Sequence, residues 1–170
     1  MSRDHTAPTS HFAKISWARS CTLRRLAACL LTCERTRGYA SIEPVAVRVG
    51  IDLVAVESVS DALREHGDRY LDRIYTEAEV RQCRTSHGLA HARLAARFAA
   101  KEATIKVLRP ADEPVPWRSI ELVRHPSGWI DLELSGRAAA LAADQSLGDF
   151  AVSVSHEAGF ATAVVIAHAT

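Results

Sequence analysis

The sequence predicts an α+β fold in which a mainly antiparallel sheet packs on a long helix. A strand-like run rich in β-branched residues begins at Val47, and a long helical stretch lies between Gly88 and Pro110. Later segments that alternate in hydrophobicity are joined by short turns, which is typical of hairpins and therefore of antiparallel strands. The chain has 170 residues, enough for one domain with a sizeable core but not for two.

The N-terminal segment differs from the rest of the chain in charge and pattern. Seven lysines and arginines precede Ala46, against three acidic residues, and no hydrophobic period is sustained there. Met1 is the only methionine in the chain. Valine codons just before the first expected strand could serve as alternative starts of translation. We therefore expect residues 1–45 to be an N-terminal extension that is disordered or not natively translated, and residues 46–170 to be the domain. The alternative is a basic targeting or docking arm.

Composition narrows the class of function and the compartment. The formal net charge is +1, so no strong field indicates nucleic acid or an acidic membrane as a partner. The longest apolar run, 26–31, is far shorter than the roughly 20 residues of a membrane span. The 4 cysteines form no CxxC motif and make a poor disulfide framework. These features favour a cytoplasmic protein with no nucleic-acid or membrane partner.

Local patterns define the elements that precede the long helix. The expected segments are a strand at 47–54 and helices at 59–66, 69–74 and 77–84. Gly67 ends the first of these helices. Thr76 and Glu79 have the spacing of a capping box, which marks the start of the third. The long helix should end near Pro110, because proline rarely continues a helix.

The C-terminal third should contain two hairpins and one helix. The expected segments are strands at 119–124 and 129–134, a helix at 135–147, and strands at 150–155 and 160–167. Pro126, Ser127 and Gly128 form a turn-rich link between the first two strands. In the second strand, three aliphatic residues alternate with Trp129 and two acidic residues. Gly148 should stop the alanine-rich helix.

A helical wheel of the long helix predicts which of its sides is buried. The residues expected to share the core face are Leu94, Phe98, Ile105 and Leu108. Three alanines, Ala95, Ala99 and Ala103, form a small-residue surface near Glu102. Another backbone or a ligand could approach the helix closely at this surface.

The flanks of the same helix carry charged residues. Glu102 and Lys106 lie together on one flank of the core face, whereas Arg97 and Lys101 lie on or beside the opposite flank. Lys101 borders the apolar stripe, so it must reach outward or meet a partner.

Three segments carry the candidate functional residues: GIDLV at 50–54, RFAAKEATIK at 97–106 and VSVSHE at 152–157. Each has an ordinary structural interpretation when taken alone. Asp52 interrupts an apolar strand and would suit a turn or a solvated edge. Glu102 and Lys106 have the spacing of a helix-surface ion pair, and His156 would suit the polar end of a strand.

Together, and in this order, the three segments resemble the holo-acyl-carrier-protein synthase family, the small trimeric class of 4′-phosphopantetheinyl transferases. The resemblance covers nearly all of 47–168. It implies a 4′-phosphopantetheinyl transferase-like fold and a homotrimer with sites at the subunit interfaces. The implied reaction is transfer of 4′-phosphopantetheine from coenzyme A to a serine hydroxyl of an apo acyl carrier protein. It requires Mg²⁺, releases adenosine 3′,5′-bisphosphate and serves fatty acid biosynthesis.

The resemblance also implies roles for individual residues. Asp52 and Glu102 match the magnesium ligands, which agrees with the preference of that ion for carboxylates beside substrate phosphates. Lys106 and Arg97 match positions that contact coenzyme A phosphates, and Lys101 is a further candidate for such a contact.

The proton acceptor is left open by the sequence. His156 matches a strand-end histidine beside the active site in the family. Glu102 acting through a water, or His156 directly, would take the proton of the carrier serine. Glu157 follows at a position where an acidic residue is common, so it joins the cofactor-binding candidates.

One departure from the family pattern concerns the carrier protein. Shortly after the aspartate the family shows Glu-Arg-Ile, whose arginine grips the acidic carrier, but this sequence has Glu57, Ser58 and Val59. We therefore expect carrier choice to shift from the fatty-acid type toward a polyketide type.

Two other classes of function compete with this assignment. One is an inactive homologue that keeps coenzyme A or metal binding, and the other is a domain tethered to nucleic acid or membrane by the basic N-terminal arm.

Overall fold

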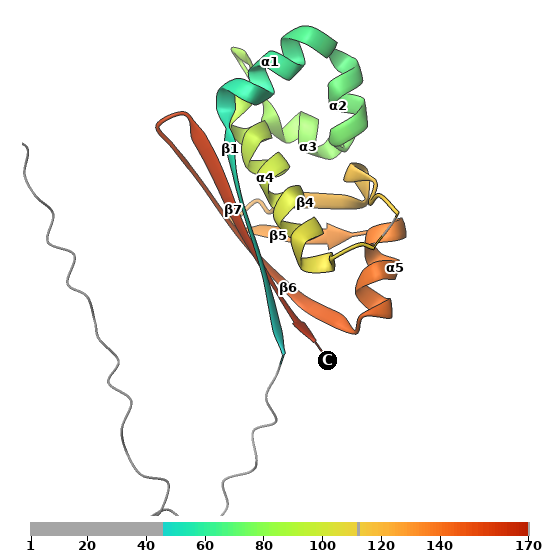
Figure 1. Ribbon diagram of the computed structural model, residues 1–170. Helices are drawn as coiled ribbons and strands as arrows, with labels where there is room; N and C mark the ends of the chain where they lie inside the picture. The colour runs from blue at the N-terminus through green and yellow to red at the C-terminus, as the bar shows by residue number, and fades with distance from the viewer. Residues whose placement is uncertain (1–45, 112, 170) are drawn as a thin grey trace, which may run out of the picture. The chain divides into compact units, whose positions relative to one another are not determined.

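The computed structural model describes residues 46–111 and 113–169, and Figure 1 labels the helices and the longer strands. The expected extension at 1–45 lies outside the described residues. The elements are, in chain order, β1 (Val47–Ala55), α1 (Val56–His66), α2 (Asp68–Ile74), α3 (Glu77–Cys83), β2 (Arg84–Thr85), β3 (Gly88–Leu89), α4 (His91–Leu108), the 3-10 turn η1 (Trp117–Ser119), β4 (Ile120–Arg124), β5 (Ile130–Leu134), α5 (Gly136–Asp144), β6 (Leu147–Glu157) and β7 (Phe160–Ala169). No helix within these residues is long and apolar enough to cross a membrane.

All strand pairs in the described residues are antiparallel, which confirms the predicted fold class. The main sheet has three strands, and β7 lies between β1 and β6. β1 pairs with β7 along its whole length, from Val47 opposite His168 to Ala55 opposite Phe160. β4 pairs with β5, and β2 pairs with β3, as two smaller ladders.

The long helix α4 packs against one face of the main sheet (Figure 1). Alternate residues of β1 point toward the helix. The Arg48 guanidinium donates to the carbonyl of Val107 at 3.2 Å, near the helix C-terminus. A Cβ built on Gly50 would lie 2.0 Å from the carbonyl oxygen of Ala103. Since no real Cβ fits at that distance, a glycine at position 50 is what allows β1 to lie so close to α4.

The helical wheel is confirmed at two of its four core-face positions and overestimates the burial of the other two. Leu94 and Leu108 are fully buried, whereas Phe98 and Ile105 are only partly buried. The three alanines of the small-residue surface, Ala95, Ala99 and Ala103, are each 0% exposed. The backbone of β1 reaches this surface at Gly50, so a strand and not a ligand makes the close approach.

Three boundaries, the start of α1, the end of α5 and the start of β6, each differ by three residues from those expected. α1 starts at Val56 instead of position 59. α5 ends at Asp144 instead of position 147, and Ser146 then takes a positive φ of 51°, which turns the chain. Leu147 and Gly148 begin strand β6, where Gly148 pairs with His168. The apolar Leu147 therefore extends the sheet and not the helix.

The face of the main sheet that points away from α4 is apolar and exposed. On β1 its residues are Val47, Val49, Ile51 and Leu53, with exposed fractions of 50%, 59%, 60% and 64%. On β7, Val164 and Ile166 lie opposite Ile51 and Val49. We call these six residues the outer sheet face. An apolar surface of this kind indicates a protein–protein contact.

Candidate functional site

The first group of candidate residues lies where β1 contacts α4. Asp52 is on the helix-facing side of β1, and Lys106 is in the last turns of α4. The Lys106 ammonium donates to Asp52 Oδ1 at 2.8 Å and to the carbonyl of Ile51 at 2.7 Å. Glu102 lies one turn before Lys106 and feels the charges of both Asp52 and Lys106. We call Asp52, Glu102 and Lys106 the carboxylate cluster.

The carboxylate cluster fits a magnesium ion completed by substrate. Burial raises the pKa of the Glu102 carboxyl above its usual value, the charge of Asp52 raises it further, and Lys106 opposes both effects. A small divalent cation would neutralise two such carboxylates. Among the described residues no group of three or more His, Cys, Asp or Glu side chains could hold a metal ion. Magnesium needs only one or two carboxylates when phosphates and waters supply the other oxygens.

The second group of candidate residues lines a groove of about 650 Å³. The groove lies among α4, the β4–β5 hairpin and β6, and it contains Arg97 and His156. Arg93 and Arg124 add two more guanidinium groups to its lining, which includes no Asp or Glu. None of these arginines forms an ion pair with another described residue. We call this the cationic groove, and its uncompensated charge suits an anion.

Arg97 is the residue of the groove best suited to bind an anion. Its side chain is buried, with 6% exposed, yet it meets no carboxylate. One guanidinium nitrogen donates to the carbonyl of Arg93 at 3.2 Å, and another donates to Gln82 Oε1 at 2.7 Å. The buried Nε has no hydrogen-bond partner. A buried cation with an unused donor is costly unless a ligand completes it.

Lys101 does not join either group. Its ammonium is 0% exposed and lies 2.8 Å from the Glu79 carboxylate, which is also 0% exposed. It also donates to the carbonyls of Trp117, at 3.1 Å, and Ile120. Burial lowers the pKa of Lys101, and Glu79 counteracts this shift. The lysine therefore meets a partner inside the protein, which was one of the two outcomes expected for it, and its amine is not accessible to a phosphate.

Glu157 follows His156 at the end of β6 and is exposed. Both residues line a shallow hollow of about 340 Å³ beside the β6–β7 turn, together with Gly159 and Phe160. The Gly159 carbonyl accepts a hydrogen bond from Val56 N at 2.8 Å, which ties this turn to the start of α1. His156 thus lies between the hollow and the cationic groove.

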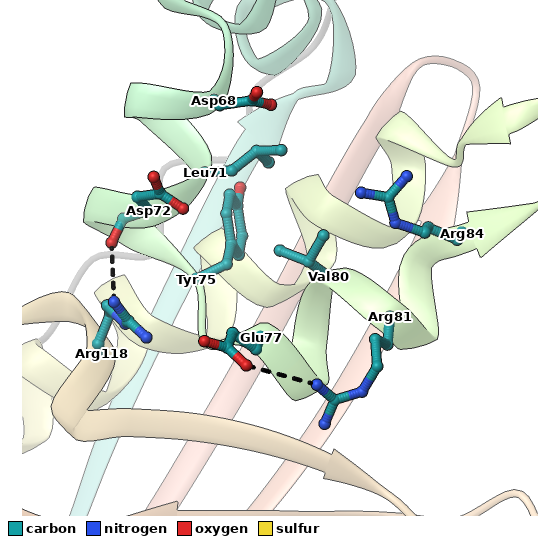
Figure 2. Close-up of a pocket in the computed structure, with 9 residues that line it drawn as sticks. All are labelled: Asp68, Leu71, Asp72, Tyr75, Glu77, Val80, Arg81, Arg84 and Arg118. Carbon is teal, nitrogen blue, oxygen red and sulfur yellow. Dashed lines mark hydrogen bonds and ion pairs between the residues drawn. The ribbon is translucent and has the colours of Figure 1, made fainter.

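A further cavity, of about 450 Å³, lies near α2 and α3 (Figure 2). Several of its charged groups already have partners. Glu77 pairs with Arg81 at 3.7 Å, and Arg118 donates to the carbonyl of Asp72 at 3.4 Å (Figure 2). None of the candidate residues lines this cavity, so we give it no part in the chemistry.

Sequence reasoning missed three groove residues, Arg93, Arg124 and Trp129. Of these three residues, only Trp129 could have been noticed in the sequence, because it is an aromatic residue on the polar side of an alternating strand. Arg93 and Arg124 give no local signal, because ordinary surface arginines look the same in a sequence.

The chain is similar to known proteins in sequence and in fold. Residues 48–165 match the family model described as the 4′-phosphopantetheinyl transferase superfamily. A holo-[acyl-carrier-protein] synthase from Koribacter versatilis is 42% identical over 120 residues, which are 69% of this chain and 94% of that protein. The protein of the same name from Gloeobacter violaceus is 40% identical over 118 residues, 69% of this chain and 89% of that protein. A solved ACPS–CoA complex from Chronobacterium ammoniagenes has a TM-score of 0.65 and 32% identity, covering 74% of this chain and 98% of that one.

Proposed function

Because the chain belongs to the 4′-phosphopantetheinyl transferase superfamily, we propose that it is a holo-[acyl-carrier-protein] synthase. It transfers 4′-phosphopantetheine from coenzyme A to a serine hydroxyl of an apo acyl carrier protein and releases adenosine 3′,5′-bisphosphate. Relatives of that name align over most of their length. Within the molecule, the observation that carries the proposal is the carboxylate cluster, in which Asp52 and Glu102 meet beside Lys106.

The carboxylate cluster and the cationic groove each bind a different part of coenzyme A. Asp52 and Glu102 would hold Mg²⁺, which when bound would supply positive charge to the pyrophosphate. Lys106 offers a mobile point charge to a phosphate, whereas Arg97 offers a forked guanidinium. Glu157, at the edge of the hollow beside His156, orients the histidine or the ligand. Lys101 has a structural role instead, because it is buried against Glu79.

The carrier serine must lose a proton as its oxygen attacks the β-phosphorus of coenzyme A. Glu102 lies in the carboxylate cluster, which the proposal places beside the pyrophosphate, so a water held by its carboxylate would lie near the attacking serine. We therefore assign the proton to Glu102 through a water, and phosphate binding to His156. His156→Ala should then raise KM for coenzyme A more than it lowers kcat. A fall in kcat of more than about a hundredfold at saturating coenzyme A would instead make His156 the base.

The site is shared between subunits of a homotrimer. In one chain, the cationic groove and the carboxylate cluster have no lining residue in common. The exposed outer sheet face, centred on Ile51, supplies an apolar surface on which copies pack. Packing of this kind brings the groove of one copy to the carboxylate cluster of the next, so that coenzyme A lies across the interface.

Mass spectrometry of an apo carrier protein tests the reaction. Incubation with the full chain, coenzyme A and magnesium should add one phosphopantetheine to the carrier. The gain should disappear with Glu102→Gln, an isosteric change, and after chelation of the metal. Circular dichroism of the variant controls for folding. No mass gain across a panel of fatty-acid and polyketide carriers would contradict the proposal and favour a module that only binds coenzyme A.

Subunit complementation tests the shared site. Asp52→Asn and Arg97→Gln should each abolish most transfer when assayed alone. Co-refolded in equal amounts, the two variants should recover about a quarter of wild-type activity, because that share of interfaces combines an intact carboxylate cluster with an intact groove. The control is a mixture of Asp52→Asn with Glu102→Gln, which should recover nothing. Equal failure of both mixtures would place the whole site in one chain.

Carrier choice follows from the surface of α1. Ser58 is exposed there beside the exposed Glu57, so the start of α1 offers no cation to an acidic carrier, and the basic residues of this helix lie in its last turn. We expect kcat/KM to favour a polyketide-type carrier over a fatty-acid carrier. Ser58→Arg should shift the preference toward the fatty-acid carrier, whereas Ser58→Gln, a neutral control, should not. Equal rates with both carriers in all three proteins would refute this preference.

We assign the enzyme to the cytoplasm and its product to fatty acid or polyketide synthesis. Cys83, the free thiol within the described residues, is buried, as suits a reducing compartment. Fractionation of cells that produce the full chain, including residues 1–45, checks the compartment.

A further inference from the structure

Trp129 is unusually exposed to solvent for such a large side chain. It directly precedes β5, the return strand of the β4–β5 hairpin, and 67% of its surface is exposed. Burial of an indole is strongly favourable, so an aromatic ring left open at a groove indicates a surface that another molecule covers. Trp129 lines the cationic groove beside Gly128.

The hairpin holds the indole in place. The backbone N–H of His125 donates to the carbonyl of Trp129 at 3.0 Å, and Gly128 N donates back to the carbonyl of His125 at 2.9 Å. The His125 ring is fixed by Asp131, 2.8 Å from its Nε2. It then meets the indole edge to face, with ring centroids 5.5 Å apart and an interplanar angle of 68°. The ring is therefore oriented before any ligand arrives, which lowers the entropy cost of stacking on it.

The groove around the indole carries the charge that a nucleotide requires. Arg124 pairs with Ile130, the residue after Trp129, and both line the groove. Arg97 contributes a buried guanidinium with an unused Nε. An aromatic platform next to uncompensated guanidinium groups matches a flat base attached to a phosphorylated sugar. Coenzyme A has one such part, its adenosine 3′-phosphate.

We propose that Trp129 is the residue on which the adenine ring of coenzyme A stacks. The inference rests on the proposed function, which makes coenzyme A the co-substrate, and it deepens that function by naming a residue that selects the donor. Trp129 is a binding and not a catalytic residue, since adenine lies far along the molecule from the reacting β-phosphorus. Its contribution should therefore be the same in the ground state and the transition state.

Removal of the ring should change binding and not chemistry. Trp129→Ala in the full chain should weaken adenosine 3′,5′-bisphosphate by roughly tenfold to a hundredfold in calorimetry, the usual range for loss of one stacked base. KM for coenzyme A should rise by a similar factor, and kcat should change by less than about twofold. Trp129→Phe should keep most of the affinity, and 4′-phosphopantetheine, which lacks adenine, should bind the wild type and the alanine variant equally.

Fluorescence gives an independent measurement. The chain has 3 tryptophans, and replacing the other two with phenylalanine leaves Trp129 as the reporter. Of these two, Trp117 stacks on Phe98 with centroids 5.1 Å apart, so phenylalanine keeps that contact. Adenosine 3′,5′-bisphosphate should quench the Trp129 signal, and 4′-phosphopantetheine should not.

Three results would overturn the inference: unchanged nucleotide affinity in Trp129→Ala, an equal loss of affinity for 4′-phosphopantetheine, or no quenching. The two proposals can also fail separately. Trp129-dependent nucleotide binding without carrier modification would refute the proposed function and support the role of Trp129. Carrier modification with a KM that does not depend on Trp129 would do the opposite.

Discussion

Substitution of Lys101 by methionine distinguishes a structural lysine from a coenzyme A ligand. Methionine keeps an apolar stem of similar length but removes the ammonium that lies 2.8 Å from Glu79. The Glu79 carboxylate would then keep only the backbone donors of Thr76, at 2.9 Å, and Leu122, at 3.1 Å. Removing one partner of a fully buried ion pair costs about 3–5 kcal/mol, because the other charge stays buried.

A loss of this size should lower Tm by about 10–20 °C for a domain of this length. The measurement is thermal unfolding by circular dichroism at a fixed protein concentration, because the proposed assembly would make Tm concentration-dependent. Below the transition, Lys101→Met should keep KM for coenzyme A within about twofold of wild type, since the buried amine does not reach the ligand.

Lys106→Met is the matched control. Lys106 is half exposed, with 50% of its side chain accessible, and its pair with Asp52 should be worth at most about 1 kcal/mol. This variant should unfold close to the wild type but show a raised KM for coenzyme A. The opposite pattern, an unchanged Tm with a raised KM in Lys101→Met, would refute the reasoning and make Lys101 a coenzyme A ligand.

Three further predictions concern the strand β1 and the helix α4. Gly50→Ala should cost about 3 kcal/mol or more in urea unfolding, because the new Cβ would lie 2.0 Å from the Ala103 carbonyl oxygen; a loss below 1 kcal/mol would contradict this packing. Glu102→Gln should raise Tm in the presence of a chelator by removing repulsion from Asp52, even though it abolishes transfer. The raised pKa means that ionisation of Glu102 costs stability as pH rises, so the gain should vanish below pH 4.5, and a gain that persists there would have another cause. Ile51→Glu should convert the proposed trimer into an inactive but folded monomer in light scattering, and an intact trimer would rule out the outer sheet face as the interface.

Local patterns predicted most of the fold because its elements are short and follow strong signals. The capping box at Thr76 and Glu79 is present in both of its hydrogen bonds. The wheel underestimated the alanine surface of α4, because hydropathy gives alanine little weight although small residues decide how closely a strand can approach. α5 ends early, and Ser146 then takes a positive φ. A serine in a sequence does not indicate that backbone conformation.

Long-range pairing accounts for what the sequence could not predict in the site. Glu79 was visible only as part of a capping box, yet its carboxylate also pairs with Lys101 across the core. The neighbours of Arg97 come from α3 and α4, and the groove is completed by β5 and β6. No spacing within one segment contains that information. Motif order brought Asp52 and Glu102 together as candidates, but only the fold separates them from Arg97 and His156.

The nine residues of β1 point alternately to two faces of the sheet, and each face has its own role. Asp52 faces α4 within the carboxylate cluster, while its neighbours Ile51 and Leu53 belong to the outer sheet face. Inserting or deleting one residue in this strand would exchange the two sets, so that a carboxylate lies on the proposed subunit interface and a leucine faces Glu102. During evolution, β1 should therefore accept exchanges between apolar residues on its outer side but reject changes in length, because a single such event would disturb the carboxylate cluster and the proposed subunit interface together.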